Sequence, residues 1–146
     1  MRVLIQRVSW SRIEVDGREI NSIGPGLLVL LGVADLDEEN DAEYLAAKTA
    51  SLRIFKDSEG KMNLSIGETG GEVLVISQFT LVADTKKGNR PGFGSGAPPD
   101  RAERLYERFV KELGDLGVIV KKGIFGADMA VSLLNDGPVT ILLESR

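Results

Sequence analysis

The sequence predicts one α/β (α+β) domain over residues 1–146, with a mainly antiparallel, barrel-like sheet and two helices packed on it. Three observations favour this class. Stretches of β type outnumber helical ones, short turns join several of them, and two segments have the length and apolar spacing of a helix. Of the 146 residues, 42% are hydrophobic and 27% charged, which fits one domain with a usable core.

The first part of the chain is predicted to be β structure. Residues 2–9 alternate and are rich in branched side chains, which indicates a strand. Residues 11–23 predict a hairpin whose two-residue turn is Asp16-Gly17. The apolar run 27–34 is typical of a strand that is buried on both faces.

The middle of the chain begins with a helix. The acidic segment 35–43 leads into a helix of about 15 residues, because acidic side chains favour a helix N-terminus. Residues 56–63 predict a loop, and residues 71–83 form the most strand-like stretch. Residues 84–99 predict a loop rich in Gly and Pro, and a long loop in a small domain is often functional.

The last part of the chain contains the clearest helix, from Asp100 to the residue before Gly114. Its apolar positions form one stripe: Ala102, Leu105, Tyr106, Phe109, Val110 and Leu113. Residues 117–125 predict a strand. Two final strands flank "NDGPVT" (135–140), which then has the position of a hairpin turn.

The composition excludes several kinds of chemistry. The chain has no His and no Cys, so a Ser-His-Asp triad, a Cys nucleophile and the usual zinc ligands are all ruled out. The acidic segment 35–43 lacks the Gly and Glu of a calcium-binding loop. We therefore expect no metal site and no cofactor. Catalysis would have to use carboxylates, Lys, Tyr, hydroxyls, backbone amides or groups of the substrate.

The composition also suggests a setting. The absence of Cys favours a reducing compartment, so we expect a cytoplasmic protein. The longest apolar run is too short to span a bilayer, and the first residues do not resemble a signal peptide. A net charge of −4 argues against an extended nucleic-acid-binding surface, but it allows a local basic patch.

The segment "SQFTL" (77–81) places three polar residues in an apolar stretch: Ser77, Gln78 and Thr80. One interpretation is a strand end whose polar side chains face water. The other is the polar floor of a pocket. In that case its backbone amides would bind an oxyanion, and Thr80 would position a water molecule or the reacting carbonyl.

The segment "NDGPVT" also has two interpretations. A hairpin turn is the simpler one, but Pro138 removes an N–H where the returning strand would pair. X-Pro bonds are sometimes cis, and a cis bond after Gly137 would point two carbonyls in one direction. Such a pair would hold an ammonium group and leave no room for a side chain of the wrong hand.

These two segments resemble the signature motifs of a known family, the D-aminoacyl-tRNA deacylases. "SQFT" and "NDGPVT" are similar to the family patterns S-Q-F-T and N-x-G-P-x-T. The opening "MRVLIQRVS", the loop "KKGNRPGF" and the stretch "GIFGADMAVSLLNDGP" are also similar. The resemblance extends from residue 1 to about residue 144 and therefore covers the whole chain.

The resemblance implies an enzyme of translation quality control. The family hydrolyses the ester between a D-amino acid and the terminal ribose of tRNA, removes glycine mischarged on tRNA, and spares L-aminoacyl-tRNA. This chiral proofreading takes place in a homodimer with the active sites at the interface, and it involves no membrane and no cofactor. The partners implied are therefore the 3′ end of aminoacyl-tRNA and a second copy of the chain.

The resemblance also implies roles for individual residues. The family's cis Gly-Pro peptide, matched by Gly137 and Pro138, reaches into the partner's site and rejects L side chains. The segment lining the ester, and so the catalytic segment, is matched by Ser77, Gln78, Phe79 and Thr80. The terminal adenosine would lie against Phe125 and Met129. Arg7 would brace the Gly-Pro segment, with Asn135 as a second supporting residue.

Two mechanisms remain open for the reaction. In the first, backbone amides and the substrate's ribose hydroxyl assist attack by water, which suits a chain without His or Cys. In the second, Thr80 is a covalent nucleophile, which would need a base that the sequence does not reveal.

Other interpretations also stay open at this point. The chain could be a binding module for RNA 3′ ends without catalysis, or an esterase or peptidase for D-amino-acid conjugates lacking tRNA. Phe125 and Met129 could be core residues, and Arg7 a surface charge. Five basic residues could either contact tRNA phosphates or be solvated surface charges: Lys86, Lys87, Arg90, Lys121 and Lys122.

Overall fold

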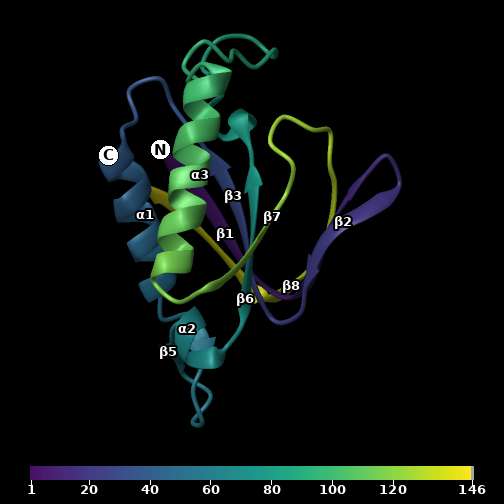
Figure 1. Cartoon of the computed structure of the whole chain (residues 1–146), viewed down its shortest axis with the longest axis vertical. Coiled ribbons are helices and arrows are strands. Elements are labelled where there is room, and N and C mark those ends of the chain that lie inside the picture. Colours follow the sequence, from purple (N-terminus) through teal and green to yellow (C-terminus); the bar gives the residue numbers. More distant parts are fainter. Residues whose placement is uncertain (146) are drawn as a thin grey trace.

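The computed structural model describes residues 1–145 and shows a curved sheet covered on one side by two helices (Figure 1). The strands are β1 (Arg2–Val15), β2 (Arg18–Ile23), β3 (Gly26–Gly32), β4 (Phe55–Lys56), β5 (Met62–Leu64), β6 (Glu72–Ser77), β7 (Ile119–Lys122) and β8 (Ala130–Glu144). The helices are α1 (Glu39–Ser51), α2 (Ile66–Thr69), the 3-10 helix η1 (Phe79–Val82) and α3 (Pro99–Asp115). No helix within these 145 residues is long and apolar enough to cross a membrane.

Strand β1 organises the six-stranded sheet. One of its edges pairs with β8 from Arg2 to Glu14, and its other edge pairs first with β3 and then with β2. These pairings are antiparallel, whereas β3–β6 and β6–β7 are parallel. The predicted class is confirmed: a mixed α/β domain with a nearly closed, barrel-like sheet.

The two long helices bury their apolar stripes against the sheet and each other. In α3 the buried side chains are Leu105, Tyr106, Phe109 and Leu113, as the apolar spacing predicts. Strand β3 is buried on both faces because the helices cover one face and a second apolar cluster covers the other. That second cluster includes Val8 of β1 and Leu74 of β6.

Several predicted elements have different limits in the structure. The predicted strand 2–9 and the first hairpin strand form one continuous β1, and the Asp16-Gly17 turn after it is confirmed by the pairing of Val15 with Arg18. The predicted loop 56–63 contains part of a small β4–β5 hairpin. The strand predicted over 71–83 ends at Ser77, because Gln78 begins a 3-10 turn.

The prediction of a hairpin turn at "NDGPVT" is wrong. Strand β8 continues through this segment and stays paired with β1 on both sides of it. Gln6 faces Thr140 and Val8 faces Asn135, so residues 136–139 lie opposite the single residue Arg7. The sequence therefore forms a large bulge in a long strand, and sequence periodicity does not distinguish such a bulge from a turn.

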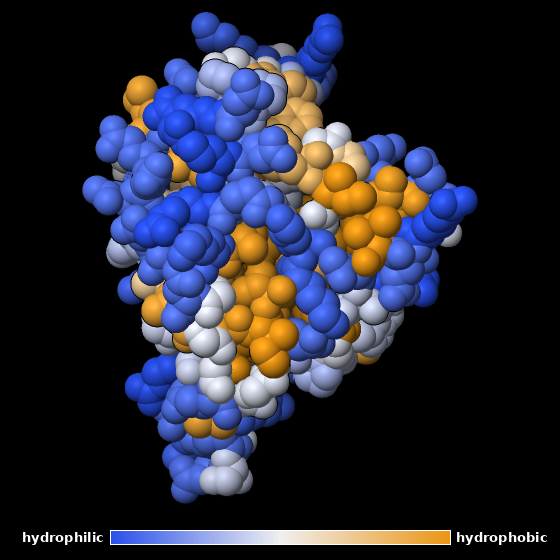
Figure 2. Space-filling view, in the orientation of Figure 1, coloured by the Kyte–Doolittle hydropathy of each residue, from blue (hydrophilic) through white to orange (hydrophobic). Residues whose placement is uncertain are grey.

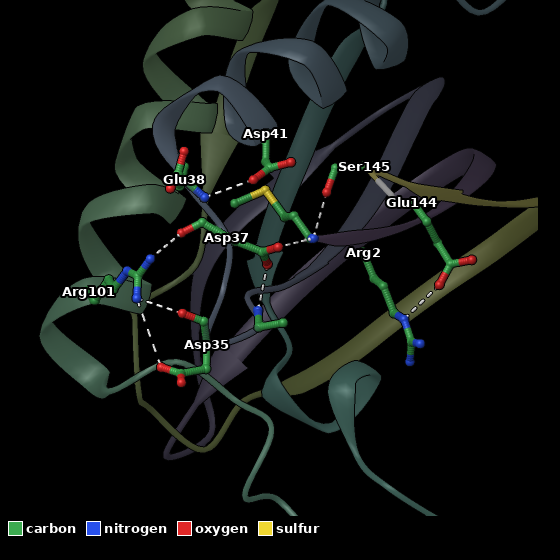
Figure 3. Close-up of polar contacts among 10 residues, drawn as sticks. Arg2, Asp35, Asp37, Glu38, Asp41, Arg101, Glu144 and Ser145 are labelled. Atoms are coloured by element: carbon green, nitrogen blue, oxygen red, sulfur yellow. Dashed lines mark hydrogen bonds and ion pairs between the residues drawn. The ribbon is translucent and has the colours of Figure 1, made fainter.

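A polar cluster around Asp37 ties together segments that are far apart in sequence (Figure 3). The buried Asp37 carboxylate accepts hydrogen bonds from the α-ammonium of Met1 and from the backbone N–H of Ala34. The same ammonium donates to Ser145 Oγ, next to the end of β8. From α3, Arg101 donates to the carbonyls of Asp35 and Asp37, so this helix is fixed to the loop that precedes α1 (Figure 3).

The closest backbone contact in the sheet gives a first prediction. A Cβ atom at Gly26 in β3 would lie 1.9 Å from the carbonyl oxygen of Glu72 in β6, whereas a Cβ atom at Gly24 would meet nothing within 4 Å. We expect Gly26→Ala to lower the free energy of unfolding by about 3 kcal/mol or more, since the parallel β3–β6 pair would have to separate. Gly24→Ala should cost less than about 1 kcal/mol. Equal effects in urea denaturation would contradict this close approach.

Candidate functional site

A cavity of about 460 Å³ opens where the carboxyl ends of β3 and β6 meet the first half of α3. The connection between β7 and β8 adds residues 125–129 to its lining. Most of its lining is apolar or aromatic: Leu31, Val33, Ile76, Phe79, Phe93, Ala97, Pro99, Ala102, Tyr106, Phe125, Ala127, Met129 and Val131. Such a lining with a few polar groups at one end is typical of a small-molecule binding site.

The polar part of the lining comes from the end of β6. The backbone N–H of Gln78 donates to Leu31 O at 2.7 Å, which is the last contact to β3 before the chain turns into η1. Ser77, Gln78 and Phe79 line the cavity, whereas the exposed Thr80 does not. The side-chain amide of Gln78 donates to Thr80 Oγ1, so Gln78 connects the cavity to this hydroxyl.

The aromatic wall of the cavity lies opposite this polar segment. Phe125 packs on Tyr106 with ring centroids 5.8 Å apart, and Met129 follows on the same connection. The hydroxyl of Tyr106 donates to Val75 O at 2.9 Å, and burial raises the pKa of Tyr106. Tyr106 therefore forms part of the wall, with its hydroxyl already bonded to the backbone of β6.

One functional candidate in the cavity escaped the sequence analysis. Asp128 is the one acidic or basic residue in the lining of this cavity within the described chain. It lies in the β7–β8 connection between Ala127 and Met129, where a carboxylate among small and apolar residues is a weak signal. A carboxylate here is able to accept hydrogen bonds from hydroxyl or ammonium groups of a ligand.

The Gly137-Pro138 bulge is held by the side chains below it. The Gly137-Pro138 peptide bond is cis. Arg7 is 4% exposed, donates to Ile54 O at 2.5 Å, and places Nε 2.9 Å from the Asp136 carboxylate. That contact is an ion pair and not a hydrogen bond, because the N–H is not directed along it.

Asn135 closes the base of the same bulge. Its side-chain amide donates to the carbonyls of Arg7 and Val139, both at 3.0 Å, and so joins the two ends of the looped-out segment. A Cβ atom at Gly137, whose φ is +119°, would lie 2.9 Å from Arg7 Nη2. Little space is therefore left beneath the bulge for any larger residue.

The structure thus separates the predicted site residues into two groups. Ser77, Gln78, Phe79, Phe125 and Met129 meet at the cavity, with Thr80 at its edge. The second group is the bulge with its supports: Arg7, Asn135, Gly137 and Pro138. Gly137 and Pro138 are exposed and do not line the cavity of their own chain.

Comparison with known proteins places this arrangement in a family. The sequence model described as D-Tyr-tRNA(Tyr) deacylase matches residues 4–144. The chain belongs to the D-Tyr-tRNA deacylase family. D-aminoacyl-tRNA deacylases from Anaeromyxobacter dehalogenans and Paracoccus denitrificans are 57% and 58% identical to it, over 100% and 99% of this chain and 98% and 97% of theirs.

Solved structures share the fold of this chain. One, described as the c-Myc DNA unwinding element binding protein, has a TM-score of 0.94 at 39% identity, covering 100% of this chain and 99% of its own. A probable eukaryotic D-amino acid tRNA deacylase has a TM-score of 0.82 at 19% identity, covering 98% of each chain. The second likeness concerns the fold only.

The buried Arg7 gives a second prediction. We expect Arg7→Ala to lower the free energy of unfolding by about 2–4 kcal/mol, because it removes the donor to a buried carbonyl and leaves a void under the bulge. Arg12→Ala is the control, since Arg12 lies on the same strand, is exposed, and has a 3.6 Å ion pair with Glu14. It should change stability by less than about 0.5 kcal/mol in urea denaturation. A similar loss of stability in Arg7→Ala and Arg12→Ala would contradict the support of the bulge by Arg7.

Proposed function

We propose that the chain hydrolyses the ester of D-aminoacyl-tRNA, and of glycine mischarged on tRNA, in the cytoplasm. The observation that carries this proposal is the cavity. It joins an apolar wall, Phe125 and Met129, to the segment from Ser77 to Phe79 with its polar groups, within about 460 Å³. A terminal adenosine would pack on the wall, and the ester bond would then lie near the polar segment.

The polar segment supplies donors suited to an oxyanion. A 3-10 helix that begins at Phe79 leaves the N–H groups of its first residues without helical acceptors. The amides of Phe79 and Thr80 would stabilise the charge that develops on the ester carbonyl. The attacking water would be assisted by the neighbouring ribose hydroxyl, so no side-chain base is needed.

The contact at Thr80 argues against a covalent mechanism. The hydrogen bond at Thr80 Oγ1 comes from the Gln78 amide, which is a donor and is unable to remove the hydroxyl proton. A Thr nucleophile needs an adjacent base within hydrogen-bond reach. Thr80 would instead fix the Gln78 side chain at the cavity.

A test of the activity and of its mechanism uses D-Tyr-tRNA and L-Tyr-tRNA. We expect the wild type to release D-Tyr at catalytic enzyme concentration and to leave L-Tyr-tRNA intact. Thr80→Val, which removes the hydroxyl at nearly constant size, should lower kcat by about tenfold or less. Loss of a covalent nucleophile would lower it by roughly 10⁴-fold or more.

The outcomes of this test separate the functions. No turnover of either ester, combined with tight binding of the tRNA, would indicate a binding module for RNA 3′ ends. Equal turnover of a free D-aminoacyl ester without tRNA would indicate a general esterase. A Thr80→Val variant without measurable activity would support the covalent route.

We further propose a homodimer in which each Gly137-Pro138 bulge enters the partner's cavity and excludes L side chains. Two observations support this. The bulge is exposed and lies outside the cavity of its own chain. The outer edge of β8 pairs with no other strand of the described residues, and Leu134 and Leu142 on it are 53% and 52% exposed. An exposed edge strand presents unpaired N–H and C=O groups with which a second chain is able to pair.

Mixing two inactive variants tests the shared site. Gly137→Ala would displace the bulge and Gln78→Ala would alter the cavity, so each homodimer would carry two defective sites. After subunit exchange, half of the dimers are mixed, and in each of these one of the two sites has both parts intact. We expect about a quarter of the wild-type rate on D-Tyr-tRNA. No recovery, with exchange verified by mass, would contradict the shared site.

A further inference from the structure

The loop at residues 84–96, called the mouth loop below, connects η1 to α3 (Figure 1) and contributes Phe93 and Gly96 to the lining of the cavity. It is anchored at its base by the paired backbone bonds between Asp84 and Gly92. Its second half is fixed by the bridge between Gly96 and Ala34 and by the Ser95 hydroxyl, which donates to Val82 O at 2.6 Å. The loop therefore has a defined position at the rim of the site.

The mouth loop carries three exposed cations, Lys86, Lys87 and Arg90, without an ion pair anywhere in residues 1–145. Other cations that the sequence offers for phosphate binding are already neutralised. Lys121 lies 2.9 Å from the Glu72 carboxylate and lowers the pKa of that carboxyl, and Lys122 lies 2.6 Å from Glu107. In a chain of net charge −4, the unpaired positive charge of this loop needs an explanation.

Two exposed aromatic side chains lie at the cavity, and one of them, Phe93, follows Arg90 by three positions in the mouth loop. Phe93 of the mouth loop and Phe79 of η1 are 44% and 62% exposed, and their ring centroids are 5.0 Å apart at an interplanar angle of 59°. Both residues also line the cavity. Figure 2 shows a further apolar surface over β7 and the β7–β8 connection, bordered by hydrophilic residues. Cations beside exposed rings are typical of surfaces that bind single-stranded nucleic acid.

A second hollow, of about 470 Å³, lies on the other side of the same loop. Its lining includes Lys86, Thr85 and Ser95 of the loop and Arg2 of β1. Arg2 is already bonded to Glu144 and to Leu81 O, so Lys86 is the cation of this hollow that has no ion pair among the described residues. Asp84 also lines the hollow, and its carboxylate accepts the backbone N–H of Lys86. The Lys86 ammonium has no such partner among the described residues, so it is the group that would meet an RNA strand leaving the cavity over the mouth loop.

We propose that the mouth loop binds the single-stranded RNA that precedes the terminal nucleotide in the cavity. Lys86, Lys87 and Arg90 contact its phosphates, and Phe93 stacks on a base. The inference rests on the proposed function, because that function places the terminal adenosine in the cavity. It adds the residues that distinguish a tRNA from a small aminoacyl nucleoside.

The test compares two substrates that share the ester and the adenine. D-Tyr-tRNA carries the RNA strand, whereas 3′-O-D-tyrosyl-adenosine has no phosphate. The variant is Lys86→Ala/Lys87→Ala/Arg90→Ala. The matched control is Arg18→Ala/Lys48→Ala/Lys56→Ala, which makes the same change in net charge at three exposed cations that also lack ion pairs within the described chain. Thermal unfolding verifies that both variants are folded.

We expect the mouth-loop variant to lose about tenfold or more in kcat/KM on D-Tyr-tRNA at low salt. The slope of log kcat/KM against log salt should become shallower by about 2, since each single-stranded phosphate contact contributes roughly 0.7. On the adenosine ester the change should be less than twofold, and the control should match the wild type on both substrates.

Three results would overturn the proposal or separate it from the proposed function. If the mouth-loop variant and the control variant lose kcat/KM on D-Tyr-tRNA equally, the effect comes from the net charge of the protein and not from this loop. If the mouth-loop variant loses the same factor in kcat/KM on D-Tyr-tRNA and on the adenosine ester, the loop acts on the nucleoside in the cavity and not on the RNA strand. If the wild type hydrolyses neither ester, the proposed function fails. The RNA contact is then tested separately by the binding of uncharged tRNA, measured by fluorescence anisotropy. If the mouth-loop variant binds uncharged tRNA as tightly as the wild type, the proposed RNA contact is overturned as well.

Discussion

The antiparallel pairing of β1 with β8 is the constraint on which the rest of the structure depends. The two strands are in register on both sides of Arg7, so residues 136–139 have to leave the sheet. A shift of one residue would reverse which side chains of β8 face the core, so the pairing is firmly specified at both ends. The exposed Gly137-Pro138 bulge is therefore a consequence of the sheet, and the buried Arg7 and the Asn135 amide hold its form.

The cavity has a different structural origin from the bulge. Strands β3 and β6 are parallel, so their carboxyl ends meet at the same edge of the sheet. There Leu31 and Val33 lie beside Ser77, while α3 and the β7–β8 connection add the walls. The close backbone approach of Gly26 to Glu72 secures this pair of strands at the opposite end. In one chain, then, the substrate cavity and the bulge belong to separate parts of the sheet.

The chemistry of the site follows from what the chain lacks. Without His or Cys, the proposed mechanism relies on residues at the cavity that position groups and not on a side-chain nucleophile or base. The Gln78 amide occupies Thr80 Oγ1 as a donor, and the start of η1 leaves backbone amides near the cavity. Such a site suits an activated ester whose own ribose hydroxyl assists the reaction. Phosphate contacts outside the cavity would then add substrate recognition without changing that chemistry.

Much was determined by the sequence itself. Periodicity located β1, β3, α1 and α3, because an amphipathic or buried element must show its apolar spacing locally. The two motifs contain Ser77, Gln78 and Phe79 of the cavity and Asn135, Gly137 and Pro138 of the bulge, whereas Arg7, Phe125 and Met129 came from the resemblance of the whole chain to the family.

Only the tertiary structure decided the rest, because it depends on contacts between distant segments. The end of β6 at Ser77 depends on the bond from Gln78 to Leu31. The segment "NDGPVT" forms a bulge and not the predicted turn because the residues on both sides of it pair with β1, which lies more than a hundred residues earlier in the chain. Asp128 and Phe93 became site residues only when α3 and the connections around it enclosed the cavity. Local patterns carry no information about such long-range partners, since packing and register decide them.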